Sequence, residues 1–107
     1  MKQLTASEFE SEVTRFALPV VIDFHTDRCG PCRMMAPVLN ELAAENANRF
    51  RIVKVDAAEE SQLASEHAVS VVPTFVVFRR GEPVGQKTGM QSKQALLAWI
   101  EEAIDGN

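Results

Sequence analysis

The chain has 107 residues, of which 46% are hydrophobic and 24% charged, a composition typical of one compact domain, here spanning residues 1–107. Its 15 acidic and 11 basic residues give a net charge of -4, which argues against a nucleic-acid partner. No stretch has the pattern of a signal peptide, and the longest apolar run, FALPVVI, is far too short to cross a membrane. We therefore expect a cytoplasmic monomer that binds neither nucleic acid nor membrane.

The first half of the chain predicts a short extended start, a helix, a strand and a second helix. A capping-box pattern at Thr5 and helically spaced apolar residues predict a first helix from about Ala6 to about Phe16. The next segment, PVVIDFH, is almost continuously apolar and predicts a strand that is buried on both faces. The second helix begins at CGPC and continues beyond Pro37, which we expect to kink it.

The second half predicts three more strands and two more helices. Residues 51–56 form a predicted strand, ESQLASEH a short helix, and VSVVPTFVVF a strand that Pro73 interrupts. A turn at Gly81 leads to an edge strand over residues 84–87, and Ser92 caps a last helix. The order β-α-β-α-β-α-β-β-α predicts an α/β fold in which a mixed central sheet has helices on both faces.

The only two cysteines, Cys29 and Cys32, flank Gly30 and Pro31 at the predicted start of the second helix. Unpaired N–H groups and the helix dipole at this position favour a thiolate, which is the nucleophilic form of cysteine. Pro31 suits the first helical turn because its missing N–H has no helical partner there, and Gly30 leaves the sulfur uncrowded. The pattern predicts that Cys29 attacks a substrate disulfide and that Cys32 resolves the mixed disulfide.

Two other roles are open to this cysteine pair. A zinc site needs four ligands, and the only histidines, His25 and His67, do not stand at the usual spacing from the cysteines. A purely structural pair is the other alternative, although Gly-Pro between the cysteines suits a tight exposed turn better than a core. We expect no metal site.

Asp23 places a carboxyl group inside the apolar strand that precedes the cysteines. Burial should raise its pKa, and from below the motif it could accept the proton of Cys32. The alternative is a carboxyl that backbone or water satisfies and that takes no part in catalysis. Lys54, in the next predicted strand, could tune Asp23 or could be an ordinary surface lysine.

Pro73 stands within a strand pattern, where a proline indicates an edge or a bend. If this bend lies beside the thiols, the backbone groups of Val72 stay free to pair with an extended substrate strand.

Taken together, these features resemble the thioredoxin family over residues 3–104. The matching pieces are Asp23, the sequence CGPC at residues 29–32, Pro37, residues 54–56, the sequence VPT at residues 72–74, Gly81 and Gly89. The resemblance implies a thioredoxin fold, a cis bond before Pro73, and dithiol–disulfide exchange with protein substrates. It also implies that Asp23 is functional.

The resemblance further implies a substrate surface, a partner and a cofactor state. The implied surface consists of Gly30, Pro31, Val72, Pro73, Thr74 and Gly89. No cofactor is expected to be bound, because a thioredoxin reductase-like flavoprotein that uses NADPH recharges the Cys29–Cys32 disulfide in the family.

Two residues depart from the family pattern. Arg28 stands where tryptophan usually precedes the first cysteine, and His25 stands where an aromatic residue is common. Arg28 should favour the Cys29 thiolate while it changes the surface on which partners dock. His25 is either a packed or solvated strand-end residue or a pH-dependent tuner of Cys29.

Two functional interpretations are open. The first is a thiol–disulfide oxidoreductase that mainly reduces protein disulfides, either as a general member of the family or as one specialised in its partners. The alternative is a non-catalytic binding module built on the same fold, although such a module has no need for both cysteines, Asp23 and the proline loop together.

Overall fold

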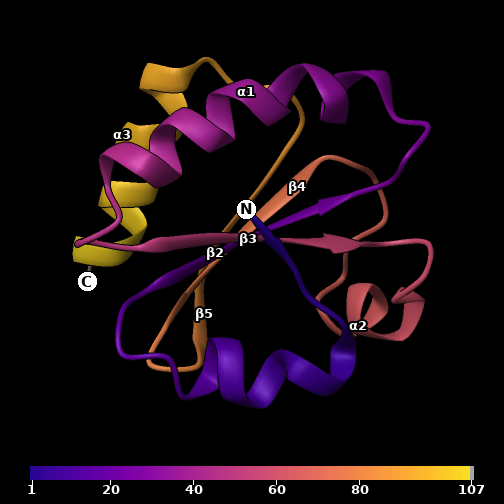
Figure 1. Cartoon of the computed structure of the whole chain (residues 1–107), viewed down its shortest axis with the longest axis horizontal. Coiled ribbons are helices and arrows are strands. Elements are labelled where there is room, and N and C mark those ends of the chain that lie inside the picture. The colour runs from indigo at the N-terminus through magenta and orange to yellow at the C-terminus, as the bar shows by residue number, and fades with distance from the viewer. Residues whose placement is uncertain (107) are drawn as a thin grey trace.

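A mixed five-stranded sheet forms the centre of the protein in the computed structural model, which describes residues 1–106 (Figure 1). The strands are β1 (Lys2–Gln3), β2 (Val20–His25), β3 (Arg51–Asp56), β4 (Thr74–Arg79) and β5 (Glu82–Thr88). They lie in the order β1-β3-β2-β4-β5. β3 runs parallel to both β1 and β2, whereas β4 is antiparallel to β2 and β5.

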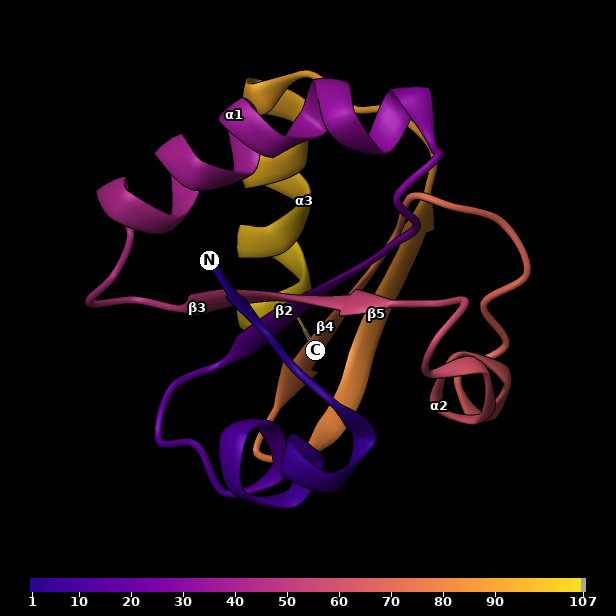
Figure 2. The ribbon, with the colours of Figure 1, turned by 45° about the vertical axis from the view of Figure 1, so that its right-hand side comes forward.

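Helices cover both faces of this sheet, as the sequence predicted. They are a 3-10 turn η1 (Ala6–Glu8), a π-helical segment η2 (Glu10–Thr14), α1 (Gly30–Glu45), α2 (Ser61–Glu66) and α3 (Lys93–Asp105). α1 and α3 lie over one face, and η1, η2 and α2 lie over the other (Figures 1 and 2). No helix within residues 1–106 is both long and apolar enough to cross a membrane.

β2 separates two hydrophobic cores because its side chains alternate between the faces of the sheet. Val20, Ile22 and Phe24 pack in the core beneath η2 and α2, whereas Val21 joins the core beneath α1 and α3. The alternation places Asp23 and His25 on the α1 side, in line with Val21. The polar residues of β2 therefore point toward the helix that follows the cysteines.

The segment after β1 differs from its prediction, a single helix over residues 6–16. The amide of Glu8 donates to the carbonyl of Thr5 at 3.1 Å, and the Glu8 carboxylate accepts from the amide of Thr5 at 3.0 Å. These bonds close a tight 3-10 turn. The amide of Arg15 then donates to the carbonyl of Glu10 at 3.0 Å, a spacing that defines a π-helix. The segment is thus a 3-10 turn followed by a π-helical turn, and it buries Val13. The spacing of the apolar residues alone did not distinguish this arrangement from an α-helix.

The segment around Pro73 also differs from its prediction. β4 begins only at Thr74, and residues 69–73 form a loop in place of the first half of the predicted strand. Pro73 has no N–H to donate to a neighbouring strand, so the ladder starts after it. The Val72–Pro73 peptide bond is cis. At the other end of the sheet, β5 is longer than the predicted residues 84–87.

Candidate active site

Cys29 occupies the N-cap of α1, so its sulfur lies against the unpaired backbone groups of the first helical turn. Its Sγ accepts a hydrogen bond from the amide of Cys32 at 3.1 Å. The two cysteines form a disulfide, with their Cα atoms 5.2 Å apart. Because the same N–H and the helix dipole favour an anion, this position stabilises a thiolate on Cys29 once the disulfide is reduced.

The two sulfur-bearing residues differ in their access to solvent. Cys29 is partly exposed, whereas the side chain of Cys32 is only 6% exposed. Gly30 and Pro31, which separate them, are both exposed. An incoming disulfide can therefore reach Cys29 but not Cys32.

The loop before β4 brings residues from the second half of the chain against the disulfide. Cys29 Sγ lies 3.8 Å from the carbonyl oxygen of Val72, a residue 43 positions away in the sequence. The carbonyl of Pro73 accepts from the amide of Gly89 at 2.8 Å, which joins the turn after β5 to this loop. The Thr74 side chain is fully buried and donates to the carbonyl of Val71 at 2.7 Å, so it shapes the loop from beneath.

Asp23 lies beneath the disulfide, in the middle of the buried β2. Its side chain is 3% exposed, and its Oδ1 atom has no hydrogen-bond partner within residues 1–106. Burial raises the pKa of Asp23 from 3.8 to about 7, and the nearby Lys54 ammonium opposes that rise. Lys54 sits beside Asp23 on β3, at the paired position of the parallel ladder, and is partly exposed.

A cavity of about 350 Å³ connects these polar residues with Cys32. Its lining consists of Met1, Asp23, His25, Thr26, Asp27, Cys32, Arg33, Ala36 and Lys54. The sequence identified Asp23, His25, Cys32 and Lys54 separately but did not place them around one space. Met1, Thr26, Asp27 and Ala36 carried no signal of this kind, because their place depends on how the N-terminus and α1 pack against β2.

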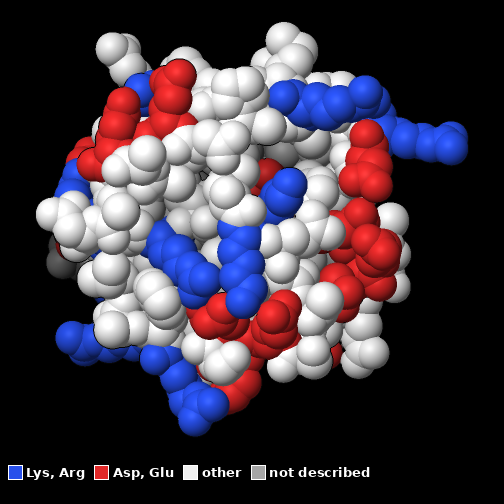
Figure 3. All heavy atoms as spheres, in the orientation of Figure 1, with Lys and Arg blue, Asp and Glu red and all other residues white. Residues whose placement is uncertain are grey.

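His25 is buried near the cysteine motif, whereas Arg28 is exposed beside it. His25 is 9% exposed, and its Nε2 atom has no partner in the described part of the chain. Arg28 is exposed just before Cys29, and Arg33 is exposed in the first turn of α1. Basic side chains gather at the N-terminal end of α1, beside a band of acidic side chains (Figure 3). Two arginines thus flank the cysteine motif in the sequence, with the exposed Asp27 next to the first of them.

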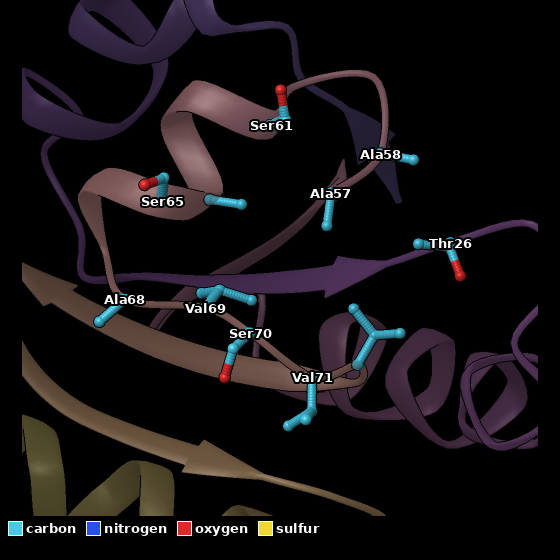
Figure 4. Close-up of a pocket in the computed structure, with 11 residues that line it drawn as sticks. Thr26, Ala57, Ala58, Ser61, Ser65, Ala68, Val69, Ser70 and Val71 are labelled. Atoms are coloured by element: carbon cyan, nitrogen blue, oxygen red, sulfur yellow. The ribbon is translucent and has the colours of Figure 1, made fainter.

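A second cavity, of about 620 Å³, opens on the other side of the proline loop. This cavity lies between α2, which carries Ser61 and Ser65, and the loop that carries Val69 and Val71 (Figure 4). Alanine, serine, threonine and valine provide the whole lining, which includes Val72. The cavity is therefore uncharged and adjoins the residue that contacts Cys29.

Three of the large exposed apolar side chains belong to segments around the disulfide. Met34 is 65% exposed on α1, Val71 is 55% exposed before Pro73, and Met90 is 49% exposed after Gly89. Exposed large apolar side chains near a reactive site are candidates for contact with a partner protein. Within residues 1–106, no three His, Cys, Asp or Glu side chains are arranged to hold a metal ion.

Comparison with known proteins identifies the family. The thioredoxin family model matches residues 1–102. The chain belongs to the thioredoxin family. It is 35% identical to a thioredoxin of Rickettsia prowazekii over 104 residues, which cover 97% of this chain and 99% of the relative. It is 37% identical to thioredoxin 1 of Nostoc sp. over 102 residues, which cover 95% of each chain.

A third relative has a different organisation. The chain is 35% identical over 102 residues to the bifunctional thioredoxin reductase/thioredoxin of Mycobacterium leprae, covering 95% of this chain and 22% of that protein.

Family membership and the Cys29–Cys32 disulfide establish a thiol–disulfide oxidoreductase with a redox-active disulfide. The predicted family and fold class are both confirmed.

Proposed function

We propose that this protein reduces disulfides in protein substrates, with Cys29 as the attacking thiolate and Cys32 as the resolving thiol. The observation that carries the assignment is the difference between the two cysteines. Cys29 is accessible and its sulfur accepts a helical N–H at 3.1 Å, whereas Cys32 is buried next to a cavity that Asp23 also lines.

The reaction proceeds in two exchanges. The Cys29 thiolate attacks one sulfur of the substrate disulfide, forms a mixed disulfide, and releases the other substrate sulfur as a thiolate. Cys32 then loses its proton and attacks Cys29 Sγ, which breaks the bond to the substrate. The substrate leaves with two reduced sulfurs, and the protein is left with the Cys29–Cys32 disulfide.

Asp23 serves as the proton acceptor in the second exchange. A base works best when its pKa lies near the working pH, and the pKa of Asp23, about 7, meets that condition. The carboxyl and Cys32 line the same cavity, so the proton has a short path between them. Lys54, beside Asp23 on β3, keeps the pKa of this carboxyl from rising further.

Substrates bind as an extended strand along the proline loop. Neither the amide nor the carbonyl of Val72 has a backbone partner within the described residues, so both are available to an incoming strand. Gly30, Pro31 and Gly89 provide an accessible surface around the sulfur, while Pro73 and Thr74, which are buried, shape the loop from beneath. The uncharged cavity beside Val72 accepts an apolar side chain next to the substrate cysteine.

The partner range is narrower than that of a general thioredoxin. Arg28 presents a cation where the family usually presents a flat aromatic surface, and Arg33 adds a second cation close by. This charge favours disulfides with acidic neighbours and disfavours those with basic neighbours.

The oxidised protein is recharged by a thioredoxin reductase-like flavoprotein that draws on NADPH. The Mycobacterium leprae relative, whose name joins a thioredoxin reductase and a thioredoxin, supports this partner.

The assay that tests the proposed function is reduction of insulin disulfides by dithiothreitol. We expect strong acceleration by the wild type, loss of acceleration in Cys29→Ser and partial loss in Asp23→Ala. Cys32→Ser should instead trap substrates as stable mixed disulfides. A folded, fully reduced wild type that neither accelerates the reaction nor forms a trapped complex would indicate a non-catalytic binding module.

A further inference from the structure

Two buried polar atoms lack a hydrogen-bond partner within residues 1–106, and both belong to β2. They are Oδ1 of Asp23 and Nε2 of His25, whose side chains are 3% and 9% exposed. Buried polar atoms are almost always paired, so each exception calls for an explanation. The proposed function gives the unpaired carboxyl of Asp23 a role as proton acceptor, but it gives His25 none.

The two side chains share one face of the strand and one cavity. Residues two apart on a strand point to the same side and lie about 6.6 Å from each other along the chain. Since neither unpaired atom has a direct hydrogen-bond partner among the described residues, a proton that moves between the two groups needs a bridging water. The cavity that both residues line measures about 350 Å³, which is room for several water molecules.

We propose that His25 is a positioning residue for the second exchange: it receives, through water in this cavity, the proton that Asp23 takes from Cys32, and passes it to solvent. The inference rests on the proposed function, because it needs Cys32 to resolve a mixed disulfide.

The proton and electron balance of the step is simple. Cys32 gives its proton to the Asp23 carboxylate, and its sulfur attacks Cys29 Sγ while the bond from Cys29 to the substrate breaks. The substrate sulfur leaves with the electron pair of that bond. The proton moves from Asp23 through cavity water to Nε2 of His25, and the ring then releases the proton of its other nitrogen to bulk water, which restores the carboxylate and a neutral imidazole. No further oxidant or reductant is required.

The chemistry of the two groups supports this transfer. The Asp23 carboxyl and the imidazole of His25 are both groups that can accept and release a proton, both are buried, and both line the cavity that reaches Cys32. The other titratable or charged groups that face the cavity from neighbouring elements are Asp27, Arg33, Lys54 and the N-terminus at Met1.

Asp56 is a further charged group beside His25. It sits opposite His25 in the β2–β3 ladder. Its carboxylate accepts from the amides of Ala58 and Glu59 at 2.9 and 3.1 Å, which occupies it in the turn after β3. Asp23 is therefore the carboxyl group of this cavity that is both buried and unpaired.

The test follows the two exchanges separately with the aromatic disulfide dithiobis(nitrobenzoate) as the substrate. The reduced protein releases one thionitrobenzoate when Cys29 attacks, and a second when Cys32 resolves the mixed disulfide, so stopped-flow absorbance resolves both. We expect His25→Phe to slow the second release by about tenfold, with the first release changed less than about twofold.

Imidazole rescue distinguishes proton transfer from packing. In His25→Ala, which leaves an open space, added imidazole should restore the second release in proportion to its concentration. His67→Gln is the matched control, because His67 packs against Phe9 and Phe78 on the opposite face of the sheet. We expect that variant to behave as the wild type in both releases.

The results that overturn the inference differ from those that overturn the proposed function. A wild type that releases only one thionitrobenzoate removes the resolving role of Cys32 itself. With two releases in the wild type, an unchanged second release in both His25 variants removes His25 from the proton path. Equal slowing of both releases without imidazole rescue also removes it and leaves only a packing role.

Discussion

Replacement of Asp23 by asparagine should stabilise the oxidised protein at neutral pH. The carboxyl group is 3% exposed and has an unpaired Oδ1, so its ionised form is poorly solvated in the folded state. Asparagine resembles the protonated carboxyl in size and polarity but cannot ionise. The two proteins should therefore differ only where the wild-type carboxyl is charged.

The size of the effect follows from the pKa of Asp23, which burial raises from 3.8 to about 7. The folded protein holds this proton more tightly than the unfolded chain does, so the stabilising contribution is complete below pH 3.8. It is then lost as pH rises, at about 1.4 kcal/mol per pH unit, until the folded-state carboxyl ionises near pH 7. The interval from 3.8 to 7 spans 3.2 pH units, so the total loss is about 4 kcal/mol.

Urea unfolding of the oxidised wild type and Asp23→Asn, measured from pH 4 to pH 8, tests this reasoning. The free energies of unfolding should be nearly equal at pH 4, and the variant should be more stable by about 4 kcal/mol at pH 8. Asp27→Asn is the matched control, because Asp27 lines the same cavity but is exposed. Parallel curves for the wild type and Asp23→Asn across this range would refute the assignment of a neutral buried carboxyl.

Three further substitutions test the surroundings of the site and one turn of the scaffold. Lys54→Met removes the cation that lowers the pKa of Asp23, so a carboxyl-carbon NMR titration should show that pKa moving upward from about 7; a fall would contradict the charge effect. Arg28→Glu should slow the reaction with oxidised glutathione, an anion, by about tenfold at low salt relative to neutral hydroxyethyl disulfide, and added salt should reduce the difference. Gly81→Ala should destabilise the protein by about 1–2 kcal/mol in urea unfolding, since φ is +80° and a Cβ would stand 2.9 Å from Cγ2 of Thr14; unchanged stability would show that the turn relaxes freely.

The sequence predicted features that depend on local spacing. The motif at residues 29–32 specified a helix start, and the structure places Cys29 at the N-cap and Pro31 in the first turn. The continuous apolar run around Asp23 specified a strand buried on both faces, and every residue of β2 is buried. These predictions succeeded because a cap and a buried strand are each set by a few adjacent residues.

Features that depend on long-range packing could not be worked out from the residues in this way. The approach of Val72 to Cys29 joins positions 43 residues apart, and only the family resemblance indicated it. The shared cavity of Asp23 and His25 requires α1 to pack over one face of β2 and β3 to pair beside it. The alternation of side chains along β2 predicts that Asp23 and His25 share one face of the strand. It does not predict the walls of the cavity or the lack of hydrogen-bond partners for the two polar atoms.

The environments of the two cysteines assign the two exchanges to separate parts of the structure. Cys29 depends on the amide at the start of α1, which favours its thiolate before any substrate arrives. Cys32 is 6% exposed, and in the proposed mechanism its thiol keeps its proton until Asp23 accepts it. Changes around Arg28 should therefore act on the first exchange, and changes around Asp23 on the second. In the proposed mechanism Cys29 is therefore present as a thiolate before substrate binds, whereas Cys32 stays protonated until a mixed disulfide has formed.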